Sequence, residues 1–125
     1  MDDIEQVCPK FHEAIELVGK RWTGAIISVL MDGPRRFCEV QEAVPGLHDR
    51  LLSERLKELE AEDIVARRVY PETPVRIEYA LTAKGRDLER VVAEVRRWAN
   101  RWVAVQTGSR RVATAAAVSS DGRRK

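Results

Sequence analysis

The segment "RRVYPETPVRIEYALT", residues 67–82, constrains the fold most, because its apolar residues alternate while those of the rest of the chain do not. Its two runs surround a four-residue connection from Pro71 to Pro74, and proline cannot donate a hydrogen bond to a β-ladder. In the second run an apolar face opposes a more polar one, namely Val75, Ile77, Tyr79 and Leu81 against Arg76, Glu78 and Ala80. This period of two predicts a two-stranded β-hairpin.

Outside this segment the apolar residues recur every three or four positions, which predicts helices. We expect them from Cys8-Pro9 to Gly19, from Trp22 to Leu30, from Phe37 to Val44, from Asp49 to about Glu62, and from Thr82 to about Val105. Asp49 and Thr82 are suitable N-caps for the last two helices. The predicted fold class is α+β, and mostly α.

The helix expected over residues 49–62 has two distinct faces. Leu52, Leu56 and Leu59 lie on one side, and Arg50, Ser53, Glu54 and Lys57 lie on the other. The helix follows a Pro45-Gly46 turn and precedes the hairpin, which is the order of a winged helix-turn-helix. A polar stripe of this kind is usually only a solvated surface. Here its position between a helix-turn and a basic hairpin favours contact with DNA.

Basic residues gather where a winged helix meets DNA. They precede the third helix, lie on the fourth and flank the hairpin: Arg35, Arg36, Arg50, Arg55, Lys57, Arg67, Arg68 and Arg76. Arg50 and Ser53 are the strongest candidates for base contacts, since arginine commonly reads guanine. The net charge is +2, but segment 107–125 holds five basic residues and one acidic residue, which leaves −2 on residues 1–106. DNA affinity is therefore expected to come from local patches.

The last expected helix carries a regular apolar seam. Its members are spaced alternately three and four residues apart: Leu88, Val91, Val95, Trp98, Trp102 and Val105. Such a stripe either packs inside its own domain or pairs with a second helix as in a short coiled coil. In a domain this small the second alternative, a homodimer, is favoured. We expect residues 1–106 to form one DNA-binding and dimerisation domain and residues 107–125 to form a disordered basic tail.

Composition and motifs argue against several other classes. No apolar run approaches the ~20 residues that span a bilayer, and from its acidic character we do not expect the N-terminal segment to act as a secretory signal. Two cysteines make no disulfide framework, so we expect a cytoplasmic protein. The chain lacks a Gly-rich phosphate loop, G-x-S-x-G and H-E-x-x-H, so neither an enzyme nor a cofactor is expected. Cys8 and His12 share a helix face, but no second ligand pair follows, and no metal site is expected.

Several strings occur together in one order: "CP" (8–9), Trp22, "LMDGPRRF" (30–37), "PG" (45–46), "LSERLKELEAEDIV" (52–65) and "VYPETPVRIEYALTAKGRDL" (69–88). In these strings the chain resembles the HxlR family of bacterial winged-helix transcriptional regulators, over residues 8–105. It departs from the family at residues 19–22, where Gly-Lys-Arg-Trp replaces Gly-Gly-Lys-Trp. His48-Asp49 replaces the usual serine, and Asp63 replaces a glycine.

The resemblance implies a homodimeric repressor or activator that binds a palindromic site in double-stranded DNA. Two half-sites would then lie about 34 Å, or a multiple of that, apart. DNA contacts are expected from Arg35, Arg36, His48, Arg50, Ser53, Glu54, Lys57, Arg68 and Arg76. Dimer contacts are expected from Phe11, Leu88, Val91, Val95, Trp98, Trp102 and Val105. Some family members sense electrophiles or oxidants through an N-terminal cysteine, which makes Cys8 a candidate redox sensor.

Alternatives remain open at three places. Arg76 either contacts a phosphate or braces the hairpin through Glu72 or Glu78. Cys8, whose thiolate a helix start would favour, is either a sensor or a small packing residue, while Cys38 is expected to be partly buried and inert. The whole chain is either the regulator described, a MarR-like ligand-responsive regulator with an unknown effector, or a winged-helix protein-interaction module without DNA binding.

Overall fold

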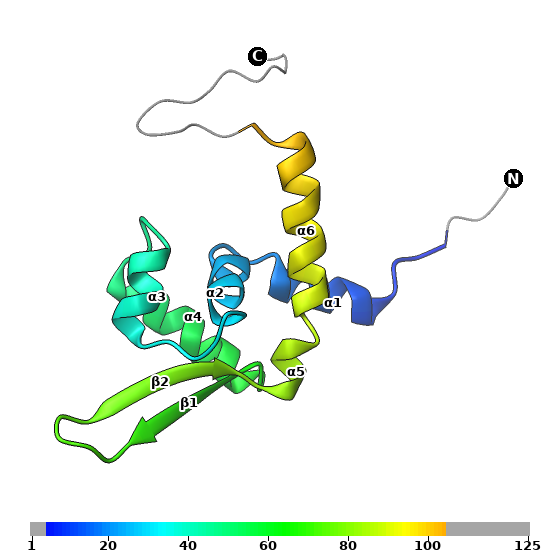
Figure 1. Ribbon diagram of the computed structural model, residues 1–125. Helices are drawn as coiled ribbons and strands as arrows, with labels where there is room; N and C mark the ends of the chain where they lie inside the picture. Colours follow the sequence, from blue (N-terminus) through cyan, green and yellow to red (C-terminus); the bar gives the residue numbers. More distant parts are fainter. Residues whose placement is uncertain (1–4, 105–125) are drawn as a thin grey trace, which may run out of the picture. The chain divides into compact units, whose positions relative to one another are not determined.

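The computed structural model describes residues 5–104 (Figure 1). The chain divides after Glu89 into two units, each of which is described by itself. The first unit contains α1 (Pro9–Val18), α2 (Thr23–Leu30), α3 (Phe37–Ala43), α4 (Asp49–Ala61), β1 (Val65–Tyr70), β2 (Arg76–Leu81) and α5 (Ala83–Arg86). The second unit begins at Arg90 and contains all of α6 (Glu89–Trp102) except its first residue. The predicted winged helix-turn-helix is confirmed. The expected tail and Val105 lie outside the described residues.

The core of the first unit joins the helix-turn-helix to the base of the hairpin. Each contributing element gives its apolar side: Ile26, Ile27 and Leu30 from α2, Val40 from α3, Leu52, Leu56 and Leu59 from α4, and Ile64, Val65, Ala80 and Leu81 from the ends of the hairpin. The leucine face of α4 is thus buried as its period predicts. Burial of such side chains stabilises the fold by roughly 1.5–3 kcal/mol each.

The hairpin extends beyond the helices, and its two strands run side by side (Figure 1). β1 pairs antiparallel with β2 from Val65 opposite Leu81 to Tyr70 opposite Arg76. Val75 lies in the connection rather than in β2, so the connection is one residue longer than predicted. The main chain of Arg35 adds a short third partner, since it exchanges two hydrogen bonds of 2.9 and 2.7 Å with Tyr79.

Helix α4 ends near Glu62 as expected, but its N-cap differs from the expectation. The N-cap is His48, with extended backbone, and Asp49 is already the first helical residue. Asp49 instead accepts a hydrogen bond from the Gln41 side chain. At the other end Asp63 adopts a left-handed conformation with φ 61°. The amide of Ile64 donates to Leu59 O and that of Asp63 to Glu60 O, both at 2.9 Å. These two bonds form a Schellman motif, a helix ending that favours glycine.

The long final helix expected from Thr82 is wrong, because the chain forms two helices there. Thr82 is an N-cap as predicted, and its Oγ1 accepts from the Gly85 amide at 3.0 Å. The helix then tightens: the Leu88 amide bonds Gly85 O at 3.0 Å, three residues back instead of four. Leu88 therefore lies in a turn between α5 and α6 and is not part of the α6 seam.

Helix α1 is amphipathic but none of its residues is buried. Its apolar side chains Phe11 and Ile15 are 60% and 46% exposed. The expected helix from Cys8-Pro9 to Gly19 is confirmed, but its apolar face is not part of this unit's core. Among the described residues, helices with the length and hydropathy required to cross a bilayer are absent.

Candidate DNA-binding surface

The polar face of α4 lies at the surface. The side chain of Arg50 is 93% exposed, and its Nε lies 3.7 Å from Glu54 Oε2, one helical turn further on. This exposed pair is too long to hold the guanidinium firmly. Lys57 is exposed and Ser53 half-buried on the same helix, and His48 is exposed at its N-cap. The structure thus brings together on one helix the five residues predicted there, with side chains that can meet a groove.

The start of α3 adds two arginines beside the hairpin. The amide of Arg36 donates to Glu39 Oε1 at 2.8 Å, which fixes the first turn of α3. The guanidinium of Arg35 donates to Pro34 O at 2.9 Å. Arg36 also lines a hollow of about 190 Å³ together with residues of the hairpin connection and of β2, including Glu72 and Arg76. The two segments predicted to meet DNA are therefore neighbours.

Arg76 makes several contacts within the hairpin. Its Nη2 lies 2.9 Å from Glu72 Oε2 and its Nη1 lies 2.6 Å from Glu78 Oε2. Its guanidinium also stacks 3.9 Å above the centroid of the Tyr70 ring. We name these four residues the wing clamp. A phosphate contact by Arg76 would have to share this guanidinium with two carboxylates, so the clamp favours the bracing alternative.

The clamp also changes the ionisation of its members. The hydrogen bond from Arg76 holds the pKa of Glu72 below its ordinary value of 4.5, and this outweighs the opposing effect of desolvation. The hydrogen bonds to Glu72 and Glu78 raise the pKa of Arg76 further above its ordinary value. Both residues are therefore charged throughout the neutral range.

The remaining hairpin arginines are exposed and lie on opposite faces. In the antiparallel register Arg68 is opposite Glu78, on the face of the wing clamp, whereas Arg67 is opposite Tyr79. Only Arg68 therefore shares the side of Arg76, as the alternation predicts.

Arg55 is one of the basic residues expected where a winged helix meets DNA. Its side chain is only 12% exposed, and its Nε donates to the main-chain carbonyl of Arg21 at 2.9 Å. It is therefore not part of the outer face of α4. Its main-chain acceptor lies 34 residues away in the chain, so a local sequence pattern cannot predict this contact.

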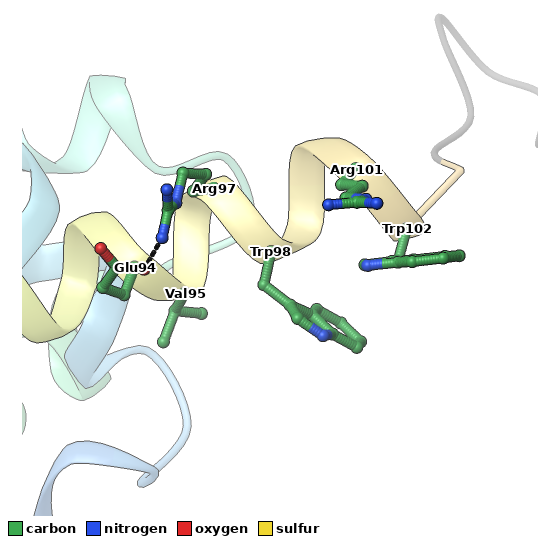
Figure 2. A pocket seen from close by; sticks show the side chains of 6 residues that line it. All are labelled: Glu94, Val95, Arg97, Trp98, Arg101 and Trp102. Atoms are coloured by element: carbon green, nitrogen blue, oxygen red, sulfur yellow. Dashed lines mark hydrogen bonds and ion pairs between the residues drawn. The ribbon is translucent and has the colours of Figure 1, made fainter.

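The side chains predicted to form a dimer seam lie along α6 and are exposed. Val91, Val95, Trp98 and Trp102 are 42%, 60%, 61% and 64% exposed. Figure 2 shows Val95, Trp98 and Trp102 along one side of α6, with Arg97 and Arg101 nearby. Together with Glu94 they line an open groove of about 590 Å³.

Both cysteines are exposed. Cys8 is the N-cap of α1, and its carbonyl accepts the His12 amide at 2.9 Å. The expectation that Cys38 is partly buried is wrong, because Cys38 is near the start of α3 with its side chain outward. Across residues 5–104, clusters of three or more histidine, cysteine or acidic residues that could hold a metal ion are absent.

Comparisons with known proteins identify the family. The model of a family described as HxlR-like helix-turn-helix matches residues 17–107. The chain is 52% identical over 96 residues to the transcriptional regulator YodB of Bacillus subtilis, covering 77% of this chain and 86% of YodB. It is 49% identical over 98 residues to the uncharacterised regulator YvaP of the same organism, covering 78% and 91%.

Solved structures agree with this assignment. The reduced form of YodB superposes with a TM-score of 0.70 at 51% identity, covering 78% of this chain and 96% of YodB. The oxidised form of the redox regulator HypR superposes with a TM-score of 0.71 at 36% identity, covering 75% and 96%. The helix-turn-helix, the wing and the similarity to these regulators lead to one conclusion. The chain belongs to the HxlR-like helix-turn-helix family and is a DNA-binding transcriptional regulator.

Proposed function

We propose that the protein acts in the cytoplasm as a homodimer on a roughly palindromic DNA site, and that oxidants or electrophiles change its DNA affinity through Cys8. The observation that carries the DNA contact is the outer face of α4, where Arg50 is 93% exposed on a helix whose opposite face is buried. Such a helix fits the major groove, and its arginine can reach the edge of a guanine.

Dimerisation is supported by the exposed apolar side chains of α6. Soluble proteins rarely leave contiguous apolar patches uncovered unless a partner binds there. Two tryptophans one helical turn apart, Trp98 and Trp102, supply much apolar area. A second copy of the chain offers an identical seam, which is the usual basis of a twofold dimer.

The DNA contact is tested by selecting bound duplexes from a random pool and then measuring affinity against salt. Several phosphate contacts should lower the affinity by orders of magnitude between 50 and 200 mM salt. Replacing Arg50 with alanine should weaken binding by about 1–3 kcal/mol and relax the base preference at one position. An unchanged preference would remove Arg50 from the interface. Absence of duplex binding even at low salt would indicate a protein-interaction module instead.

The proposed response to oxidants rests on the exposed thiol of Cys8 at the start of α1 and on the likeness to the redox regulator HypR. Exposed thiols are more readily oxidised than buried ones. Cys38 provides a matched control, since it is equally a free and exposed cysteine.

The response is tested by treating three proteins with the thiol oxidant diamide and measuring operator affinity. Diamide should alter the affinity of the wild type and of Cys38→Ser but not that of Cys8→Ser. A response that survives in Cys8→Ser and disappears in Cys38→Ser would assign sensing to α3 instead.

A further inference from the structure

We infer that Arg55 is a positioning residue for DNA recognition. It ties α4 to the loop between α1 and α2, residues 19–22, and so holds the outer face of α4 in the orientation that reads DNA. The inference rests on the proposed contact between α4 and DNA, because it concerns how that helix is aimed.

Two side chains of α4 contact this loop. Arg55 donates through Nε to Arg21 O at 2.9 Å, and its Nη1 lies 3.4 Å from both carboxylate oxygens of Glu58. Glu58 in turn accepts from Lys20 Nζ at 2.9 Å. Arg55 and Glu58 are one helical turn apart, so the loop binds α4 at two successive points.

The loop also lies against the turn of the helix-turn-helix. Trp22 has a left-handed backbone, with φ 77°, and caps α2. A Cβ added to Gly46 would lie 3.5 Å from Cη2 of the Trp22 ring. The loop thus touches both the Pro45-Gly46 turn and α4, while its C-terminal end continues into α2, which supplies buried core residues.

These contacts add directional restraints to the apolar attachment of α4. The leucines of α4 attach the helix to the core through the hydrophobic effect, which has no directional preference of its own. Hydrogen bonds are directional, and those of an ionised donor are about twice as strong as neutral ones. A rotation of α4 about its axis would move Arg50 and Ser53 in the groove, and it would have to break the bond from Arg55 to Arg21 O.

The test compares three variants by their affinity for the selected duplex and for a random duplex. Arg55→Lys keeps the charge but cannot donate to Arg21 O and Glu58 in the same geometry. Arg55→Gln removes the charge. Arg86→Gln is the matched control, since Arg86 pairs with Glu89 at 2.7 Å in the same i,i+3 arrangement but belongs to α5.

We expect the ratio of specific to non-specific affinity to fall about tenfold in both Arg55 variants and to stay unchanged in Arg86→Gln. The salt dependence of non-specific binding should be unchanged. If Arg55 contacts a phosphate, Arg55→Gln weakens both duplexes alike and the salt slope drops by about 1, which would overturn the inference. An unchanged ratio in both variants would overturn it as well.

A measurement on the wild type is independent of whether the variants fold. The Nε–H proton of Arg55 should exchange with solvent much more slowly than that of Arg50, because it is bonded to a carbonyl and shielded. Equal exchange rates would show that the tie is absent. If the wild type selects no preferred duplex, the proposed function fails, and this exchange measurement still decides whether the tie exists.

Discussion

Gly85 leaves less room for a side chain than the other described glycines. A Cβ at this position would collide with the carbonyl oxygen of Ile64 and would lie 3.2 Å from its Cγ2. Gly85→Ala should therefore destabilise the fold by about 1–3 kcal/mol, because α5 must move away from Ile64. Denaturant unfolding monitored by circular dichroism measures the change.

Gly24→Ala is the matched control, since nothing lies within 4 Å of a Cβ at Gly24 in α2. It should leave stability unchanged or raise it by up to about 1 kcal/mol. Equal losses in the two variants would mean that the close contact at Ile64 is not what makes position 85 sensitive.

The wing clamp makes a prediction about pH. The hydrogen bond from Arg76 lowers the pKa of Glu72 in the folded chain. This contribution to stability is therefore present above the ordinary pKa of 4.5 and is lost as the pH falls through the lower folded value. A titration of the Glu72 side chain by NMR should have its midpoint below 4.5 in the wild type. In Arg76→Gln the midpoint should rise toward the ordinary value, and an unmoved midpoint would contradict the clamp.

Among the elements, α4 is followed by a residue that is poorly suited to its backbone conformation. Asp63 closes the Schellman motif at φ 61°, where a side chain is strained and glycine is not. Asp63→Gly should raise the free energy of unfolding by roughly 1 kcal/mol, without changing operator affinity, since Asp63 lies beyond the last residue of the helix. Thermal and denaturant unfolding measure the effect. Asp63→Ala should not reproduce it, because alanine retains the Cβ.

The elements that could be predicted are those whose periodicity is decided locally. Three leucines at helical spacing specify the buried face of α4, and alternation from Arg76 to Leu81 specifies β2 and its faces. The break of the last helix could not be predicted, because it accompanies the close approach of Gly85 to Ile64, a contact across twenty-one residues of sequence. The contact of Arg55 could not be predicted either, because its acceptor, Arg21 O, lies in the loop between α1 and α2.

For the proposed site, the sequence predicts which side chains lie at the surface but not their individual contacts. Helical periodicity placed Arg50 and Ser53 on the outer face of α4, where they lie. The local sequence pattern cannot decide whether the guanidinium of Arg76 is free to contact a phosphate. Its partners Glu72 and Glu78 are brought to it by the folded connection and by β2. The exposure of Cys38 could not be predicted, because the residue type alone does not decide which way a side chain points on a short helix.

For the whole molecule, the exposed seam of α6 leads to a prediction about assembly. Replacing Trp98 and Trp102 together with glutamate should convert the proposed dimer into monomers, because like charges would face each other across a seam that is otherwise apolar. Sedimentation equilibrium measures the mass. Ala93→Glu with Asn100→Glu is the matched control: it adds the same charge to exposed positions on the opposite side of α6.

The same variant should show whether α6 contributes to DNA affinity through dimerisation. A dimer holds two copies of α4 at a fixed spacing, so binding one half-site raises the effective concentration of the second helix at the other. The Trp98/Trp102 variant should lose affinity for the full palindrome by at least about a hundredfold, while its affinity for a single half-site stays near that of the wild type. If half-site affinity falls equally, the substitutions have damaged the winged helix itself. If the variant remains dimeric, the copies associate through another surface, for which the exposed Phe11 and Ile15 of α1 are the next candidates.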